Sequence, residues 1–133
     1  MLARSGAGLA RKQPWRQAEQ RAGAAFLAAL DTQILLGFLL YFGLSPLTPK
    51  SFADLGTFMH VPTLRFFAVE HGVGMLVAAA AAHVGWARGK RSPDDATRQR
   101  RVLIGVGVAI LAILASIPWP FLPYGRDLFR SLG

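Results

Sequence analysis

Three long apolar stretches divide the chain, and most charged residues lie between them. The stretches cover residues 22–44, 66–87 and about 102–118. The first two have the roughly 20 residues that an α-helix needs to cross about 30 Å of hydrocarbon. Prolines at 46, 118 and 120 mark the ends of the first and third stretches, because proline cannot continue a helix. The pattern predicts an all-α integral membrane bundle of three transmembrane helices, of which the third is the shortest.

The remaining segments are short, so residues 1–133 form a single transmembrane domain. Residues 1–21 are basic and contain no apolar core of a cleaved signal peptide, so the first apolar stretch is expected to stay in the protein. Residues 45–65 form a loop whose amphipathic patch, residues 51–59, is expected along the membrane surface. Residues 88–101 form a basic loop. Within it, Ser92-Pro93-Asp94-Asp95 predicts a turn and a helix cap, followed by a short basic helix that leads into the third stretch.

The distribution of Lys and Arg predicts how the bundle is oriented. Residues 1–21 contain five and residues 88–101 contain six, whereas residues 45–65 contain two and the C-terminal tail contains two. With three crossings, eleven basic residues lie on one side and four on the other, which places the N-terminus inside and the C-terminus outside. The aromatic residues agree, with two expected at the inner interface and three at the outer one: Trp15 and Trp86, then Tyr41, Trp119 and Tyr124.

Composition excludes several classes of function. Hydrophobic residues make up 53% of the chain and charged residues 17%, which fits an integral membrane protein better than a soluble domain. The net charge of +8 does not indicate a nucleic-acid partner, because the basic residues flank the apolar stretches and are not interleaved with aromatic ones. Without cysteine, disulfides, iron–sulfur clusters and covalently attached haem are excluded. No hydrolase or transferase motif is present, so we expect no enzymatic activity.

Small residues recur every four positions in the second and third stretches. Gly74, Ala78 and Ala82 form one stripe, and Gly105 and Ala109 form another. Such stripes allow close approach of helix backbones in lipid. They are interpreted as packing surfaces.

Five polar residues fall inside the apolar stretches and carry the only chemical signal in the chain. Asp31 and Gln33 lie in the first stretch, and Glu70, His71 and His83 lie in the second. Ionisable groups are expensive in the bilayer, by about 2.5–3.5 kcal/mol at its centre, so they usually face a partner or a cavity. A proton pathway through these residues is one reading, which would require oligomerisation, because three helices hardly enclose a channel.

The histidines are the candidate metal ligands. His71 and His83 are separated by twelve residues, which is a rise of about 18 Å along a helix, so they cannot bind the same iron. A haem with two imidazole ligands therefore needs another histidine, and the remaining one is His60, in the loop.

Each polar residue also has a purely structural interpretation. Glu70 could pair with Arg65, although a spacing of five is not the ideal one on an α-helix. His71 could bond to a loop carbonyl, and His83 could be solvated near the membrane surface. An Asp31–His83 pair between the first two helices is as consistent with a structural role as with a functional one.

Several motifs together resemble a known family. They are LDTQILLGFLLYFGLSP from residue 30, LRFFAVEHGVGMLVAAAAAHVGWARGKR from residue 64, SIPWPF from residue 116 and GRDLF from residue 125. They are similar to an uncharacterised group of small bacterial membrane proteins described as cytochrome-b-like. The resemblance covers residues 15–129 and implies a haem b whose ligand is His71, with His83 as a weaker candidate.

The chain departs from that family at two places. Members have four helices, with a histidine near the start of an additional first helix, and Met1 falls where the loop after that helix would lie. Members often have a histidine at the position of Asp31. The resemblance therefore implies a shortened chain or a member that has lost a ligand.

These observations lead to two main hypotheses. The first is a small b-type-cytochrome-like membrane protein that transfers electrons, with His71, and His83 as the second candidate, facing the haem. The second is a non-catalytic subunit or assembly factor without a cofactor, whose polar residues make helix contacts. In either case the lipid bilayer is a partner, and a larger membrane complex or a homo-oligomer is plausible.

Overall fold

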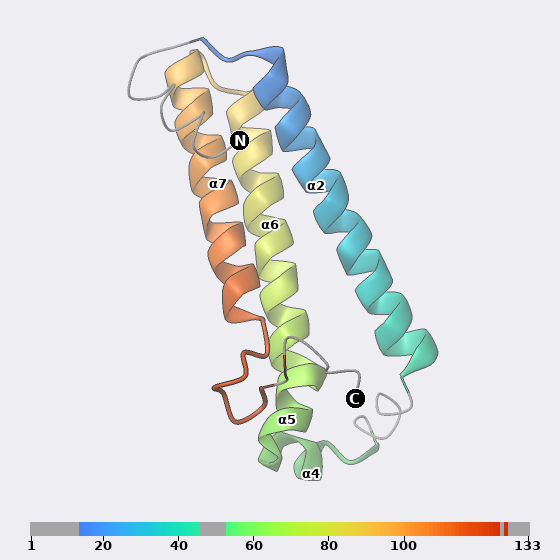
Figure 1. Ribbon diagram of the computed structural model, residues 1–133. Coiled ribbons are helices and arrows are strands. Elements are labelled where there is room, and N and C mark those ends of the chain that lie inside the picture. The colour runs from blue at the N-terminus through green and yellow to red at the C-terminus, as the bar shows by residue number, and fades with distance from the viewer. Residues whose placement is uncertain (1–13, 46–52, 126, 128–133) are drawn as a thin grey trace.

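In a computed structural model, the chain is described over residues 14–45, 53–125 and 127, and this part contains helices and no strands. The elements follow one another along three long rods and a short connection. They are α2 (Gln17–Phe38), the π-helix η1 (Leu39–Leu44), α4 (Leu55–His60), α5 (Pro62–Arg65), the π-helix η2 (Phe66–Glu70), α6 (His71–Lys90) and α7 (Asp95–Ala115). Figure 1 shows α2, α6 and α7 side by side, with α6 antiparallel to the other two.

Two of the rods are long and apolar enough to cross a membrane. One is α2 with η1, 28 residues from Gln17 to Leu44, and the other joins α5, η2 and α6 over 29 residues from Pro62 to Lys90. Only 11% of the most apolar window of each rod is buried within the structure. Apolar side chains such as Leu35 and Val73 therefore point away from the bundle, which is compatible with a membrane protein.

The first two helices extend beyond the residues predicted to span the membrane. The first helix begins at Gln17, five positions before the apolar stretch, and the second extends from Pro62 to Lys90. Polar residues continue both helices, since a helix that leaves the apolar layer keeps its backbone hydrogen bonds by remaining helical. The N-cap region of α2 also receives help from Glu19, whose carboxylate accepts the Arg16 backbone N–H at 2.7 Å.

The third helix differs more from the prediction. It extends from Asp95 to Ala115 as one element, so the expected short basic helix forms the first turns of α7. The predicted cap is confirmed: Asp94 accepts the backbone N–H of Thr97 at 2.8 Å. The apolar part of α7, residues 102–115, has a length of about 21 Å, less than the hydrocarbon thickness. α7 is not among the helices that are long and apolar enough to cross a membrane.

The small-residue stripes pack α6 against α7, as predicted. Ala78, Ala82 and Ala109 are fully buried. Gly85 faces Gly105 so closely that a Cβ on either residue would lie 2.6 Å from the Cα of the other. Glycine at both positions is therefore what brings the two backbones into contact.

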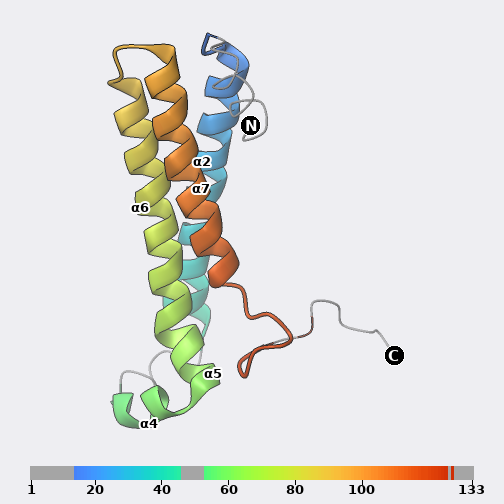
Figure 2. The ribbon, with the colours of Figure 1, turned by 90° about the vertical axis from the view of Figure 1, so that its left-hand side faces the viewer.

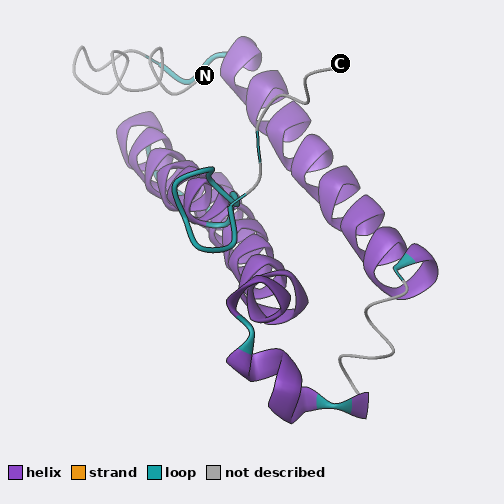
Figure 3. Cartoon of the chain, turned by 60° about the horizontal axis from the view of Figure 1, so that its bottom comes forward, coloured by secondary structure: helices purple, strands orange, loops and turns teal. Residues whose placement is uncertain are grey.

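α2 is attached less closely. Gly23 lies under the Trp86 ring near one end of α2, and Leu27 and Leu30 pack into the cluster that contains Ala78 and Ala82. Toward its other end α2 diverges from the α6–α7 pair, as Figure 1 shows, and Figure 3 shows α2 as a separate rod beside that pair. Figure 2 shows α4 and α5 at that same end, opposite the α6–α7 turn.

The aromatic residues expected at the two membrane interfaces lie toward opposite ends of the bundle. Trp15 and Trp86 meet edge to face with ring centroids 6.2 Å apart, next to the α6–α7 turn. At the other end Tyr124 stacks on Phe66 at 4.1 Å, close to the start of α6.

Candidate functional site

His71 is held by the end of α7. It is the first residue of α6, and its Nδ1 lies 2.9 Å from the backbone oxygen of Ser116, the residue that caps α7. Because a carbonyl only accepts hydrogen bonds, Nδ1 carries the proton and donates it. The ring is then in the tautomer whose Nε2 has a free lone pair. This is the state in which a neutral imidazole binds a metal.

The sequence around both residues permits this contact. Gly74 lies one turn after His71 and faces the Ser116 side chain, which a Cβ at position 74 would displace. The Ser116 hydroxyl donates to the Ala112 carbonyl at 2.8 Å, so it does not compete for the His71 ring. Ser116 is only 4% exposed. The hydrogen bond between His71 and the Ser116 carbonyl therefore lies in a closely packed part of the bundle.

Phe66 lies beside the histidine on the η2 side and belongs to a cluster of aromatic rings. Phe66 is 2% exposed, and its centroid lies 6.1 Å from the centroid of the His71 ring. Phe66 in turn stacks on Tyr124, with 12° between the ring planes, and meets Phe67 edge to face. These contacts place His71 beside a rigid apolar cluster.

Glu70 pairs with Arg65, which confirms one structural interpretation from the sequence. Arg65 Nε lies 2.6 Å from Glu70 Oε1, although the two residues are five positions apart. The π-helix η2 explains the spacing, because its hydrogen bonds join residues i and i+5 and bring such side chains above one another. Both side chains are about 40% exposed, so the pair is accessible.

A hydrogen bond links the two π-helices. The Tyr41 hydroxyl, in η1, donates to the Ala68 carbonyl, in η2, at 2.6 Å. A π-helix disturbs the regular hydrogen bonding of a helix, and a side chain of another helix can satisfy a carbonyl there. Tyr41 therefore attaches the diverging end of α2 and η1 to the second rod immediately before His71.

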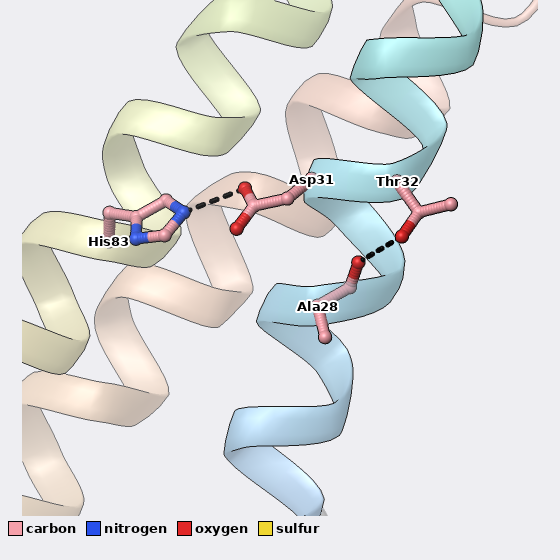
Figure 4. Close-up of polar contacts among 4 residues, drawn as sticks. All are labelled: Ala28, Asp31, Thr32 and His83. Carbon is pink, nitrogen blue, oxygen red and sulfur yellow. Dashed lines mark hydrogen bonds and ion pairs between the residues drawn. The ribbon is translucent and has the colours of Figure 1, made fainter.

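Asp31 and His83 form the predicted pair between α2 and α6. His83 Nε2 lies 2.8 Å from Asp31 Oδ1 (Figure 4), and each side chain is 48% exposed. The next residue, Thr32, bonds within its own helix, to the Ala28 carbonyl at 2.8 Å. The pair thus uses the His83 nitrogen that most often binds metals in proteins.

The structure separates the two candidate ligands, as the spacing predicted. His71 and His83 both lie in α6, about 18 Å apart along its axis. His60 ends α4 and is exposed, and Gln33 is exposed on α2. Within residues 14–45 and 53–125, no three His, Asp or Glu side chains gather as a metal site would require.

The sequence offered a backbone carbonyl as the structural partner of His71, but it does not indicate that this carbonyl belongs to Ser116. The bond from Tyr41 was missed. A partly buried tyrosine hydroxyl usually has a partner, but the acceptor of this one depends on an irregular helix.

Comparisons with protein-family models, with curated proteins and with solved structures find no match to this chain. The resemblance to the cytochrome-b-like group therefore remains a prediction from the quoted motifs. The chemistry of the candidate site rests on its own geometry, in which His71 is oriented by Ser116 and His83 is paired with Asp31.

Proposed function

We propose that this chain is a small multi-pass protein of the bacterial inner membrane that holds a b-type haem through His71 and takes part in electron transfer. The single observation that carries this proposal is the bond from His71 Nδ1 to the Ser116 carbonyl. Metal-binding histidines usually donate their second ring nitrogen to a carbonyl or carboxylate, which fixes the tautomer and the ring orientation. His71 has that arrangement, and it lies beside an apolar aromatic cluster of the kind that suits a porphyrin.

A bound haem would supply one-electron chemistry, and the residues of this chain would tune it. Ser116 orients the ligand, and the bond to its carbonyl makes the imidazole a stronger donor. Phe66 lies beside the histidine and would make the surroundings of a bound haem more apolar, which affects the reduction potential. Arg65 and Glu70 lie at the same end of α6, where a partner that exchanges electrons would approach.

His83 is a poorer ligand than His71. Its Nε2 is already bonded to Asp31, so binding iron through that atom would break the pair. A second histidine ligand would then have to come from outside α6, for example from another copy of the chain or from a larger complex. We therefore propose that the protein works in an assembly.

The proposed topology has three spans, with the N-terminus inside and the C-terminus outside. The separation of Lys and Arg supports this orientation, eleven on one side against four on the other. α7 supports a third crossing through its close packing on α6 and its exposed apolar side chains, among them Ile104 and Leu111. A local thinning of the bilayer, or the aromatic residues after Ala115, would compensate for its short apolar length.

The test is a reduced-minus-oxidised absorption spectrum of the protein purified in detergent from haem-sufficient cells. A sharp α-band is expected in the unaltered protein. It should disappear in His71→Ala and persist in His83→Ala and His60→Ala. Absence of the band in the unaltered protein would exclude the haem proposal, and a band that survives His71→Ala would exclude His71 as the ligand.

The alternative is a membrane subunit or assembly factor without a cofactor and without catalytic activity. The Asp31–His83 pair favours it, because a half-exposed polar pair within an apolar helix surface is suited to contact another membrane protein. Its test is mild co-purification from membranes. Under this alternative, Asp31→Ala releases a partner that His71→Ala retains, and no preparation shows a haem band.

A further inference from the structure

Two prolines follow α7, and their positions affect two carbonyls at its end. In an α-helix, the N–H of each residue bonds to the carbonyl four residues earlier. In a continued helix, Pro118 would face the carbonyl of Leu114, and Pro120 would face that of Ser116. Proline has no N–H, so neither carbonyl can receive its usual helical donor.

Side chains donate to both carbonyls instead. Trp119 Nε1 donates to the Leu114 carbonyl at 2.9 Å, which the Ile117 N–H also approaches at 3.4 Å. His71 Nδ1 donates to the Ser116 carbonyl, also at 2.9 Å. Ser116 is 4% exposed, and a buried carbonyl without a donor is costly. The bond from His71 therefore fills a position that Pro120 leaves open.

The segment after α7, residues 117–125, uses its backbone donors internally, and we call it the proline loop. Pro118 disfavours a helical backbone at Ile117 and so ends α7. The N–H of Trp119 then bonds to the Ile117 carbonyl at 2.9 Å, that of Leu122 to Trp119 at 3.0 Å, and that of Gly125 to Leu122 at 2.8 Å. These three N–H groups are thus directed away from Ser116.

The proline loop also returns to the surroundings of His71. Figure 2 shows it leaving α7 and turning back toward α5. A Cβ at Gly125 would collide with the Trp119 carbonyl oxygen, so glycine permits this tight turn. Just before it, Tyr124 stacks on Phe66, whose ring centroid lies 6.1 Å from that of His71. The loop therefore approaches the histidine site both through Ser116 and through Phe66.

We propose that Pro120 is a positioning residue of the histidine site. Because it has no N–H, it reserves the Ser116 carbonyl for His71 and thereby fixes which ring nitrogen is free. A ligand that binds metal through Nε2 needs its proton on Nδ1, and this bond holds it there. The importance of that nitrogen for a haem rests on the proposed function, whereas the control of the tautomer does not.

The experiment reads the tautomer of His71 directly. The full chain is labelled with [15N]histidine and studied by NMR in detergent at about pH 8, where free histidine is neutral. Protonated and unprotonated ring nitrogens have well-separated resonances, and His71→Gln identifies those of His71. We expect a protonated Nδ1 and an unprotonated Nε2. A protonated Nε2 in the unaltered protein would overturn the proposal without any variant.

A double variant then supplies the missing donor. Pro118→Ala with Pro120→Ala lets α7 continue and places an N–H opposite the Ser116 carbonyl. His71 should lose its single tautomer, because its acceptor is taken, and both ring nitrogens should show mixed protonation. Hydrogen exchange around Gly85 should stay unchanged, since the α6–α7 contact there lies far from the loop. An unchanged tautomer in the double variant would show that Pro120 does not reserve the carbonyl.

Two single variants are the matched controls. Pro118→Ala removes the first proline but still leaves no N–H at position 120, so the tautomer of His71 should stay fixed. Trp119→Phe takes the indole donor from the Leu114 carbonyl and loosens the loop without adding a donor to Ser116. It should also leave the tautomer fixed. Loss of the tautomer in both controls would show that His71 responds to any disturbance of the loop, which contradicts the assignment to Pro120.

A reduction potential separates this inference from the haem proposal. In the haem-loaded protein, the double variant should keep the His71-dependent absorption band and raise the potential, because the imidazole becomes a weaker donor. Pro118→Ala should leave the potential unchanged. An equal potential in the double variant would contradict a positioning role toward the haem. Absence of a band in every preparation would exclude the haem and leave the tautomer result in place.

Discussion

His83 Nε2 lies 2.8 Å from Asp31 Oδ1, and this bond joins α6 to α2. It lies farther from the α6–α7 turn than the contact of Gly23 with Trp86. Away from the tryptophan end, α2 has few other polar attachments to the rest of the bundle. One is the bond from Tyr41 to Ala68. The same pair removes His83 from the set of readily available metal ligands. One contact therefore bears on both the packing of the first span and the choice between the two hypotheses.

The Asp31–His83 pair should show coupling in a double-mutant cycle. Asp31→Ala, His83→Ala and the double variant are compared by denaturant unfolding in detergent. We expect a coupling free energy of about 0.6 kcal/mol, the average for polar pairs between membrane helices. Thr32→Ala is the control, because Thr32 bonds within its own helix and should not couple to His83. Strictly additive effects of Asp31→Ala and His83→Ala would contradict the pair.

Gly85 should not tolerate a methyl group, whereas Gly107 should. A Cβ at Gly85 would lie 2.6 Å from the Gly105 Cα, so Gly85→Ala must separate α6 from α7 and is expected to destabilise the protein by about 1–3 kcal/mol. Gly107 has nothing within 4 Å of such a Cβ. Gly107→Ala should therefore be neutral or stabilising by up to about 1 kcal/mol, through helix propensity. Thermal unfolding followed by circular dichroism measures both, and equal effects would contradict the close contact.

Tyr41→Phe should loosen the end of α2 without disturbing the α6–α7 pair. Removing the hydroxyl takes a donor from the Ala68 carbonyl, with an expected loss of about 1 kcal/mol. Hydrogen exchange should rise in residues 39–44 and 66–70 and stay unchanged around Gly85. Tyr124→Phe, which keeps the ring that stacks on Phe66, is the matched control. Unchanged exchange in Tyr41→Phe would show that this bond does not hold the two segments together.

The beginning of α7 should depend on pH. Bonds from the Thr97 backbone N–H and hydroxyl to the Asp94 carboxylate hold the pKa of Asp94 below its usual value of 3.8. A lowered pKa means that the cap stabilises the helix fully above about pH 3.8 and loses this effect as pH falls through the folded-state pKa. Hydrogen exchange at Thr97, corrected for its intrinsic pH dependence, should lose protection across that interval.

Asn at position 94 provides the control for this pH dependence. Asn is also a good N-cap, so Asp94→Asn should keep most of the protection at Thr97 and make it independent of pH in the acid range. Asp95→Asn should leave the pH dependence in place, since Asp94 and not Asp95 receives the Thr97 bonds. An unchanged acid transition in Asp94→Asn would assign the titration to another group.

The sequence was sufficient for the features that follow from composition and regular spacing. The three helices, the Asp94 cap, the stripe through Ala78 and Ala82, and the Asp31–His83 pair all depend on the 3.6-residue period or on local turn chemistry. The helix boundaries were less accurate because they were placed where hydrophobicity changes. Gln17 and Lys90 show that the helices continue into polar sequence.

The irregular features could be predicted only in part. The sequence raises a pair of Arg65 and Glu70, but α-helical geometry disfavours their spacing, and only η2 makes that spacing favourable. The partner of His71 is a backbone carbonyl that becomes available only because α7 ends at Ser116. Both depend on where a helix departs from regular geometry, which hydrophobic periodicity does not report.

The π-helix η2 has a consequence for how this chain can vary. A π turn contains one residue more than an α turn, so η2 holds one extra residue between α5 and α6 without rotating one relative to the other. Removing one residue from 66–69 would restore regular α geometry and leave α5 and α6 facing as they do. Arg65 and Glu70 would then stand four positions apart, a spacing that also brings their side chains together on an α-helix. The chain can therefore gain or lose one residue at this point while the ion pair, the histidine and its support keep their places.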